Sequence, residues 1–244
     1  MNKLGRSLLL QIRRDMPFIV VAGFVVVILG SVVISAGTWG VLGPLTTRVE
    51  TNQKVIALTF DDGPTQPETS RLLAVLKEEQ VKATFYLIGV EMVRQPEATN
   101  SIIAAGHEIG NHSYTHNTLM FMSWGNLSRE IELTDDLIKS HGYKGDITIR
   151  PPYGHKLIEL PVYTALHNRQ LIMWDTVLGN ERGITIDKIL RDAKQRIRPG
   201  SIVIMHAMYA HNKTTLDSVR PLIKQLKADG YRFVTVSELL RYRQ

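Results

Sequence analysis

The chain contains no cysteine, and this absence removes several kinds of chemistry at once. Without thiols there is no disulfide, no cysteine nucleophile, no iron–sulfur cluster and no zinc site with sulfur ligands. Any metal must therefore be held by histidine and carboxylate side chains. The lack of disulfides is also compatible with an exported protein that folds without them.

Excess charge is modest. The formal net charge is +6 over 244 residues, and the first 15 residues, with four bases and one acid, account for half of it. The remainder is too weakly basic to indicate nucleic acid as a partner. Wall polymers and anionic lipid headgroups stay compatible with this charge, and no feature of the sequence indicates a particular protein partner.

Charged residues are missing from Met16 to Thr47, and Phe18 to Trp39 forms an apolar run of 22 residues. A helix needs roughly 20 apolar residues to cross a bilayer. Basic residues precede the run, so the positive-inside rule predicts a cytoplasmic N-terminus and a single-pass protein of the cell membrane. We expect a basic tail (1–15), a transmembrane anchor (16–42), a linker (43–53) and an extracytoplasmic catalytic domain (54–244).

A cleaved signal peptide is the alternative for this segment. Small residues at Ser35–Gly37 have the spacing of a cleavage site, but the apolar stretch before them is longer than the usual signal-peptide core. The length of the run favours the uncleaved anchor.

The rest of the chain has no internal repeat or low-complexity tract, and apolar strand-like runs alternate with helical patterns, which indicates an α/β domain with a parallel sheet. About seven such units suggest closure into a barrel. The expected strands are Val55–Phe60, Ala83–Ile88, Glu108–Asn111, Ile147–Arg150, Leu171–Trp174, Ser201–Met205 and Phe233–Val236, and the expected helices are Pro67–Gln80, Glu91–Ala105, Leu127–His141, Leu157–Asn168, Ile184–Arg198 and Thr214–Asp229.

Polar residues recur where the predicted strands end, and in such folds function gathers at the carboxyl ends of the strands. The residues at these ends are Asp61, Asp62, His112, Arg150, Pro151, Pro152, Tyr153, Trp174, Asp175 and His206. We therefore expect one polar rim.

The adjacent acids Asp61 and Asp62 stand in the stretch TFDDG. An Asp-Gly pair before proline is ordinary turn chemistry, so the stretch alone is weak evidence for a site. Two neighbouring carboxylates also suit two roles at a metal centre, one as a ligand and one as a proton acceptor. A metal lowers the pKa of a coordinated water from about 15.7 toward about 7, within reach of an ordinary carboxylate.

His112 and His116 have the i, i+4 spacing that directs two imidazoles to one point if the stretch HSYTH is helical. With a carboxylate as third ligand, such a set leaves positions open for water and substrate, which is typical of a catalytic metal. The alternative for either histidine is a helix cap or a core residue with its hydrogen bonds satisfied, because short motifs of this kind also occur by chance.

Two further rim residues have roles to offer. His206 is suited to general acid catalysis, since histidine titrates near neutral pH, and its alternative is a buried residue bonded to the backbone. Arg150 is placed to hold a carboxylate through a bidentate ion pair. The alternative is that its side chain only fixes the conformation of a loop. The remaining histidines are interpreted as surface, strand-edge or helix residues: His107, His141, His155, His167 and His211.

The ordered blocks resemble the polysaccharide deacetylases, carbohydrate esterase family four, which share the catalytic (NodB homology) domain of the rhizobial Nod-factor deacetylase. The resemblance runs from about Lys54 to Leu240 and rests on Thr59–Gly63, His112–His116, Arg150–Tyr153 and Ile204–His206. Each block is weak alone, and the ordered set is specific. It implies a distorted, incomplete (β/α) barrel with the sugar in a groove across its rim.

The resemblance also implies residue roles. Asp61 is then the base, and Asp62, His112 and His116 bind a divalent metal, usually zinc, with cobalt or nickel as substitutes. Arg150 orients Asp61, and His206 protonates the leaving amine. The resemblance assigns substrate and oxyanion binding to the Tyr153 backbone N–H, Pro152 and Trp174.

One block departs from the family pattern. After Trp174 the family carries an acid that orients the catalytic histidine, and this chain has Val177 there, with Asn180 and Glu181 following. Asp175 is the alternative orienter of His206; otherwise that histidine is unsupported and slow.

The function expected is metal-dependent removal of N-acetyl groups from a cell-surface polysaccharide, foremost N-acetylglucosamine in peptidoglycan. Chitin oligosaccharides, another exopolysaccharide and O-acetylated xylan stay open as substrates. A second hypothesis, motivated by the altered block, is a weakly active or inactive glycan-binding wall protein.

Overall fold

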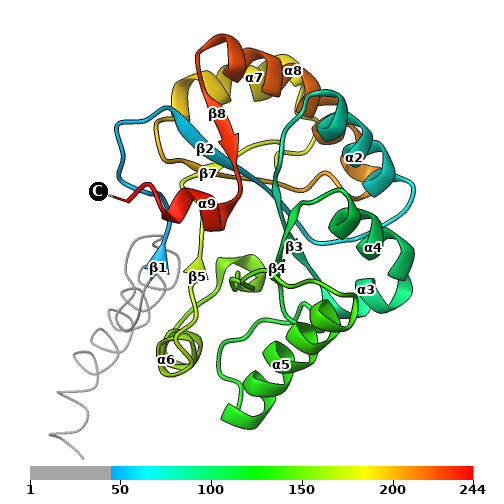
Figure 1. The fold of residues 1–244 in the computed structure, drawn as a ribbon, viewed down its shortest axis with the longest axis vertical. Coiled ribbons are helices and arrows are strands. Elements are labelled where there is room, and N and C mark those ends of the chain that lie inside the picture. Colours follow the sequence, from blue (N-terminus) through cyan, green and yellow to red (C-terminus); the bar gives the residue numbers. More distant parts are fainter. Residues whose placement is uncertain (1–44, 244) are drawn as a thin grey trace, which may run out of the picture.

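The structure is a computed structural model that describes residues 45–243. The expected basic tail and membrane anchor lie outside these residues. Among residues 45–243, no helix is long and apolar enough to cross a membrane. The described chain forms a parallel sheet with helices packed around it (Figure 1), which confirms the predicted α/β fold.

The central strand is β2 (Val55–Asp61), whose seven residues are all buried. Its apolar sequence has no alternation with polar residues, as expected of a strand covered on both faces. Every pairing in this six-stranded sheet is parallel. The order is β4 (Glu108–Asn111), β3 (Thr84–Leu87), β2, β7 (Ile202–Met205) and β6 (Thr176–Val177), with β8 (Arg232–Val234) paired to the first half of β2.

A second, two-stranded parallel sheet joins β1 (Leu45–Thr46) to β5 (Leu171–Ile172). Isolated bridges from Ile149 to Asn111 and to Leu171 link it to β4. The strand expected over 147–150 is reduced to this bridge, because its backbone pairs at a single position on each side.

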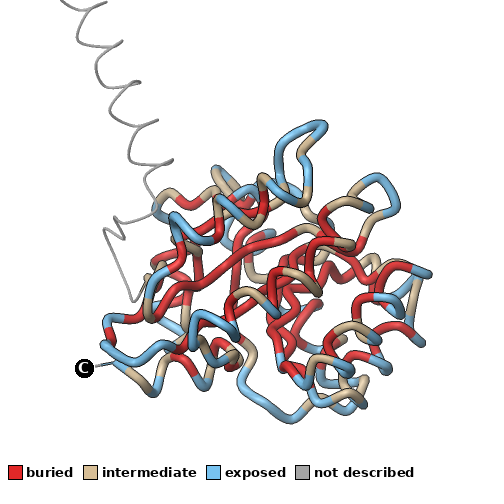
Figure 2. Tube along the Cα trace, turned by 90° about the horizontal axis from the view of Figure 1, so that it is seen from above, coloured by how far each residue is buried: buried red, intermediate tan, exposed pale blue. Residues whose placement is uncertain are grey.

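Helices cover the outside of the sheet, and Figure 2 shows buried residues along the strands and exposed residues on the outer helices and loops. Their bounds are α2 Glu68–Glu78, α3 Gly89–Arg94, α4 Pro96–Ala104, α5 Trp124–Ser140, α6 Glu159–Leu166, α7 Ile186–Arg196, α8 Lys213–Ala228 and α9 Val236–Leu240, with short 3-10 turns at Pro152–Gly154 (η1) and Ala210–Asn212 (η2). The single helix expected over 91–105 is divided into α3 and α4, because Pro96 begins a new helix at its first position.

The segment expected to be a linker is part of the domain from residue 45 onward. Its backbone pairs with β5, the Val49 N–H donates to the Gly200 carbonyl at 3.0 Å, and Val49 is fully buried. Gly200 has φ of +79°, and a Cβ there would collide with the Val49 carbonyl. Residues 45–49 therefore pack against the strands that follow them.

Candidate active site

The polar residues predicted from the strand ends gather around one cavity of about 200 Å³. It lies at the carboxyl ends of the parallel strands, where β2 ends at Asp61 and the segment after β7 carries His206. The lining residues are Asp61, Asp62, His112, His116, Pro151, Tyr153, Trp174, Val177, Asn180, Ile204 and His206.

Asp62, His112 and His116 form a compact donor set whose ligand atoms all lie within 4.8 Å of one another. Asp62 Oδ1 lies 3.1 Å from His116 Nε2 and 3.5 Å from His112 Nε2. The carboxylate is turned into the cavity because Asp62 and Gly63 both have positive φ, 68° and 58°. A Cβ at position 63 would meet the Met208 side chain at 2.9 Å, so glycine is needed there.

The two histidines meet through a loop, and not through the helical turn that was the condition attached to their i, i+4 spacing. Ser113 and His116 have φ of 65° and 62°, in the left-handed region. Asn111 Oδ1 accepts the Ser113 N–H at 2.9 Å, and Glu130 from α5 accepts the Tyr114 N–H at 2.9 Å. Sequence reasoning missed Asn111 and Glu130, since nothing in the local pattern signals that they shape this loop.

Hydrogen bonds and nearby charges orient the three side chains of this donor set for binding a cation. His112 Nδ1 donates to the Arg150 carbonyl at 2.7 Å, which leaves the Nε2 lone pair facing Asp62. Burial lowers the pKa of His112, but the Asp61 and Asp62 carboxylates outweigh burial and raise it. Burial raises the pKa of Asp62, but the closeness of His112 and His116 outweighs this and holds it well below its usual range.

A metal ion fits this donor set if the ligand atoms are not already hydrogen-bonded to other residues. Asp62 Oδ1 is buried and receives no well-directed hydrogen bond from any residue within 45–243. Two imidazoles and one carboxylate are oxygen and nitrogen donors of the kind that hold catalytic divalent metals. The set fits such a metal.

Arg150 is fully buried and fixes Asp61, which is 1% exposed. Nη1 donates to Asp61 Oδ1 at 2.5 Å and to Thr59 Oγ1 at 2.7 Å, and Nη2 donates to the Met173 carbonyl at 3.0 Å. The guanidinium also stacks 4.0 Å from the Tyr86 ring centroid. The bidentate pair expected from the sequence is wrong: one nitrogen holds the carboxylate and the other binds the backbone.

His206 enters the cavity without support on its far side. Its Nε2 lies 3.9 Å from Asp62 Oδ2, while its buried Nδ1 has no hydrogen-bond partner among the described residues. Val177 lines the same cavity. Asp175 does not orient His206: it accepts hydrogen bonds from Ser201 Oγ at 2.9 Å and the Ile202 N–H at 3.0 Å, at the opposite end of β7.

The remaining predicted residues flank the cavity. Tyr153 has φ of 59° and is 63% exposed, with its ring 4.9 Å from that of His116. Trp174 lines the cavity and packs on Gly154, where a Cβ would approach the indole to 2.8 Å. Pro152 is buried and does not line the cavity, and its neighbour Pro151 does.

Comparison with known proteins agrees with this geometry. The polysaccharide deacetylase family model matches residues 48–167. A peptidoglycan-N-acetylglucosamine deacetylase from Bacillus cereus is 31% identical over 191 residues, which cover 78% of this chain and 70% of that protein. The chain belongs to the polysaccharide deacetylase family, a family of metal-dependent hydrolases.

Solved structures show the same fold. A crystal structure of a peptidoglycan N-acetylglucosamine deacetylase, in complex with 4-naphthalen-1-yl-N-oxidanyl-benzamide, superposes with a TM-score of 0.77 at 29% identity and covers 82% of this chain and 95% of that one. A pseudoenzyme of the same esterase family from Bacillus anthracis has a TM-score of 0.73 at 27% identity, with 83% and 71% covered.

Proposed function

We propose that the protein removes the N-acetyl group from N-acetylglucosamine residues of peptidoglycan and releases acetate. The observation that carries this proposal is the meeting of Asp61, the His₂–Asp62 set and His206 at one cavity of about 200 Å³. The similarity to peptidoglycan deacetylases supports the choice of substrate.

Asp62, His112 and His116 would hold the metal, and zinc is the ion that suits two imidazoles and a carboxylate with open positions, with cobalt or nickel as substitutes. When bound, such an ion acidifies water and polarises a carbonyl group. His112 is fixed for this task by its Nδ1 bond to the Arg150 carbonyl.

Asp61 is the proposed base. Its Oδ1 is held by Arg150, and its Oδ2 lies 3.8 Å from His112 Nε2 and is left to accept a proton. As the oxygen of water bonds to the acetyl carbonyl carbon, Asp61 Oδ2 takes the proton from that water. We assign the Tyr153 backbone N–H, at the cavity edge, to the oxyanion that then develops.

His206 is the proposed acid. Its Nε2 points into the cavity beside Asp62, where it can donate a proton to the sugar nitrogen as the carbon–nitrogen bond breaks. The products are acetate and a free amine on the sugar. Asp61 then releases its proton to solvent and His206 regains one from solvent, which restores both residues for the next cycle.

The sheet shape proposed for this domain is an incomplete barrel. Pairings run from β6 through β7, β2, β3 and β4, and then through Ile149 to β5. Because β5 and β6 follow each other along the chain with three residues between them, the two ends of this series lie close together. Such curvature supports a sugar groove across the rim.

The proposed location is the outer face of the cell membrane, with residues 1–15 cytoplasmic and 16–42 as the anchor. The apolar run and its basic flank support it. The full chain should remain with membranes after salt and carbonate washing, and protease added to protoplasts should reach the domain. A soluble mature form beginning near Thr38 would favour a cleaved signal peptide.

The activity is tested by mass spectrometry of wall fragments treated with the metal-loaded protein. Loss of one acetyl group per glucosamine residue is expected, with no loss from a His112→Ala/His116→Ala double variant that keeps the wild-type circular dichroism spectrum. Intact acetylation with the loaded wild type would refute peptidoglycan as the substrate.

A weakly active glycan-binding role is the second candidate, and one observation favours it. His206 Nδ1 is buried and has no hydrogen-bond partner within residues 45–243, and Val177 lines the same cavity in place of the acid expected there. A pseudoenzyme exists among the structural neighbours. Tight sedimentation with purified wall, together with turnover no faster than that of the double variant, would identify this role.

A further inference from the structure

The direction of β1 decides which end of the domain faces the N-terminal segment. β1 runs parallel to β5, with Leu45 opposite Leu171. The chain therefore enters β1 at the amino end of the parallel strands. Asp61 and His206 lie at or beyond the carboxyl ends of β2 and β7. Whatever precedes Leu45 is attached at the end of the domain opposite the cavity.

That opposite end is rich in exposed lysine and arginine side chains, and we call it the basic amino-end face. These bases lie in the loops that lead into the parallel strands, at the start of β8 and after α9: Lys54, Lys82, Lys144, Arg198, Arg232, Arg241 and Arg243. They outnumber the exposed acids of the same end, Glu50, Asp146, Asp229 and Glu238.

Most of these side chains are held by hydrogen bonds to neutral oxygen atoms and not by ion pairs. Lys54 Nζ donates to the Asp229 carbonyl at 2.8 Å, and Arg243 Nη2 donates to Thr46 Oγ1 at 2.9 Å. Within residues 45–243, Arg198 is the member of the face with a carboxylate nearby, Asp175 at 3.7 Å. By contrast, the side-facing Lys188 bridges two acids.

The negative ends of helices account for some of these bases but not for all of them. Bases in the last turn of a helix stabilise its negative end, and Lys139 and Lys227 fit that account. Lys54 Nζ donates to the carbonyl of Asp229, the C-cap of α8, and Lys82 Nζ donates to the carbonyl of Ala105, the C-cap of α4. Lys144, Arg241 and Arg243 bind no such carbonyl and form no ion pair within residues 45–243, so their charge is available to an external partner.

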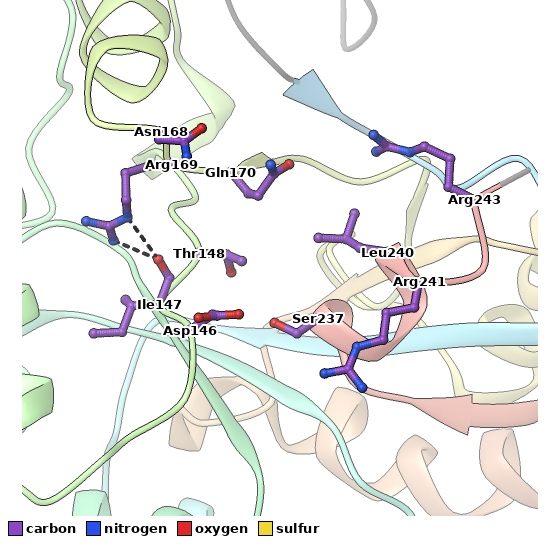
Figure 3. Close-up of a pocket in the computed structure, with 10 residues that line it drawn as sticks. All are labelled: Asp146, Ile147, Thr148, Asn168, Arg169, Gln170, Ser237, Leu240, Arg241 and Arg243. Carbon is purple, nitrogen blue, oxygen red and sulfur yellow. Dashed lines mark hydrogen bonds between the residues drawn. The ribbon is translucent and has the colours of Figure 1, made fainter.

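A groove of about 530 Å³ runs across this face, and Figure 3 shows its lining. Arg241 and Arg243 project from one side, Asn168, Arg169 and Gln170 form the other, and the groove is also lined by one acid, Asp146, which makes no ion pair with either C-terminal arginine within residues 45–243. Arg169 is already bound to Asp135 by two contacts, at 2.5 and 3.2 Å. The two C-terminal arginines are left with guanidinium donors that suit phosphate oxygens.

We propose that the basic amino-end face docks on anionic phospholipid headgroups of the membrane, with Arg241 and Arg243 at its centre. The proposal rests on the membrane anchor proposed above and not on the deacetylase activity. It gives the docked domain one orientation, with the cavity turned away from the bilayer and toward the wall.

Chain length supports lipid as the occupant. The apolar run ends at Trp39 and β1 begins at Leu45. The residues between them, 40–44, span at most about 18 Å even when fully extended. The basic amino-end face is thus held beside the headgroup layer. Arg243, which is hydrogen-bonded to Thr46, is next to the point where the chain enters the domain.

The test uses the full chain in lipid nanodiscs of phosphatidylcholine, with or without phosphatidylglycerol. Hydrogen exchange is expected to slow for amides in 141–146 and 230–243 with the anionic lipid alone, and the protection should disappear at high salt. In an Arg241→Gln/Arg243→Gln variant this protection should fall by about tenfold or more. Each basic side chain near an anionic surface strengthens membrane binding by about fivefold.

An Arg129→Gln/Arg182→Gln variant is the matched control, since it removes two exposed arginines outside the face and should keep the protection. Equal exchange in both lipids, with the chain retained in the discs, would overturn the docking proposal. So would protection by a soluble wall teichoic acid in the absence of anionic lipid. Failure of the chain to enter discs would refute the anchor and the docking together, while acetate release would test the deacetylase separately.

Discussion

Arg150 Nη1 and Asp61 Oδ1 are joined by a 2.5 Å hydrogen bond between two buried side chains. Removing the guanidinium would leave a buried carboxylate without its counter-ion. We expect Arg150→Met to cost about 3–5 kcal/mol of unfolding free energy, the usual effect of breaking a buried pair. Urea unfolding followed by circular dichroism measures this cost.

The matched variant is Arg150→Lys, which keeps the charge but cannot reach Asp61, Thr59 and the Met173 carbonyl together. Its stability should recover in part while kcat stays well below wild type. Wild-type kcat in Arg150→Lys would show that the charge alone suffices.

The two adjacent carboxylates should fail in different ways. Asp61→Asn removes the proton acceptor, so we expect the metal to stay and kcat to fall by about 10²–10⁴-fold with substrate binding little changed. Asp62→Asn removes an anionic ligand and should lower metal content. Metal analysis and turnover on both variants check this, and an exchanged pattern would exchange the roles.

Val177→Asp should supply the partner that His206 Nδ1 lacks among the described residues, because both residues line the same cavity and Val177 pairs with Ile204, two residues before the histidine. We expect kcat to rise toward about 10²-fold, the lower range for general acid catalysis, with a changed pH profile. Val177→Asn, of similar size but neutral, is the control. An equal gain in both variants would argue against a charge effect.

His107 should make stability depend on pH. It is 5% exposed, and burial together with nearby Lys82 lowers its pKa to about 4, below the ordinary 6.5. The unfolded chain therefore binds this proton first, so stability is full above pH 6.5 and falls as the pH drops toward 4. The loss is about 2 kcal/mol between pH 6.5 and 5.

The check is urea unfolding at pH 7 and pH 5 with a chelator present, so that metal loss does not contribute. His107→Asn can still accept the Ala83 N–H, as His107 Nδ1 does at 3.2 Å. Its stability should vary less with pH than that of the wild type. Equal pH dependence in the two proteins would show that His107 stays neutral in both states.

Local pattern was enough for the strands that form the centre of the fold. The predicted strand over 55–60 extends by one residue to Asp61, and the strand Glu108–Asn111 has the predicted bounds. The first is an apolar run that ends at a polar residue, and every residue of both strands is buried, which leaves little freedom in where they begin and end. Short edge pieces such as β1 and β6 were missed, because two residues carry no periodicity.

By itself, the sequence determined which chemistry is available: no thiolate, two histidines at a fixed spacing, two adjacent acids and a histidine after a buried strand. The tertiary structure decided how these groups meet. Left-handed residues, in place of a helix, bring His112 and His116 together, and Asp175 serves the start of β7 and not His206. Arg150 and Asp61, 89 positions apart, depend on strand register, which local periodicity does not specify.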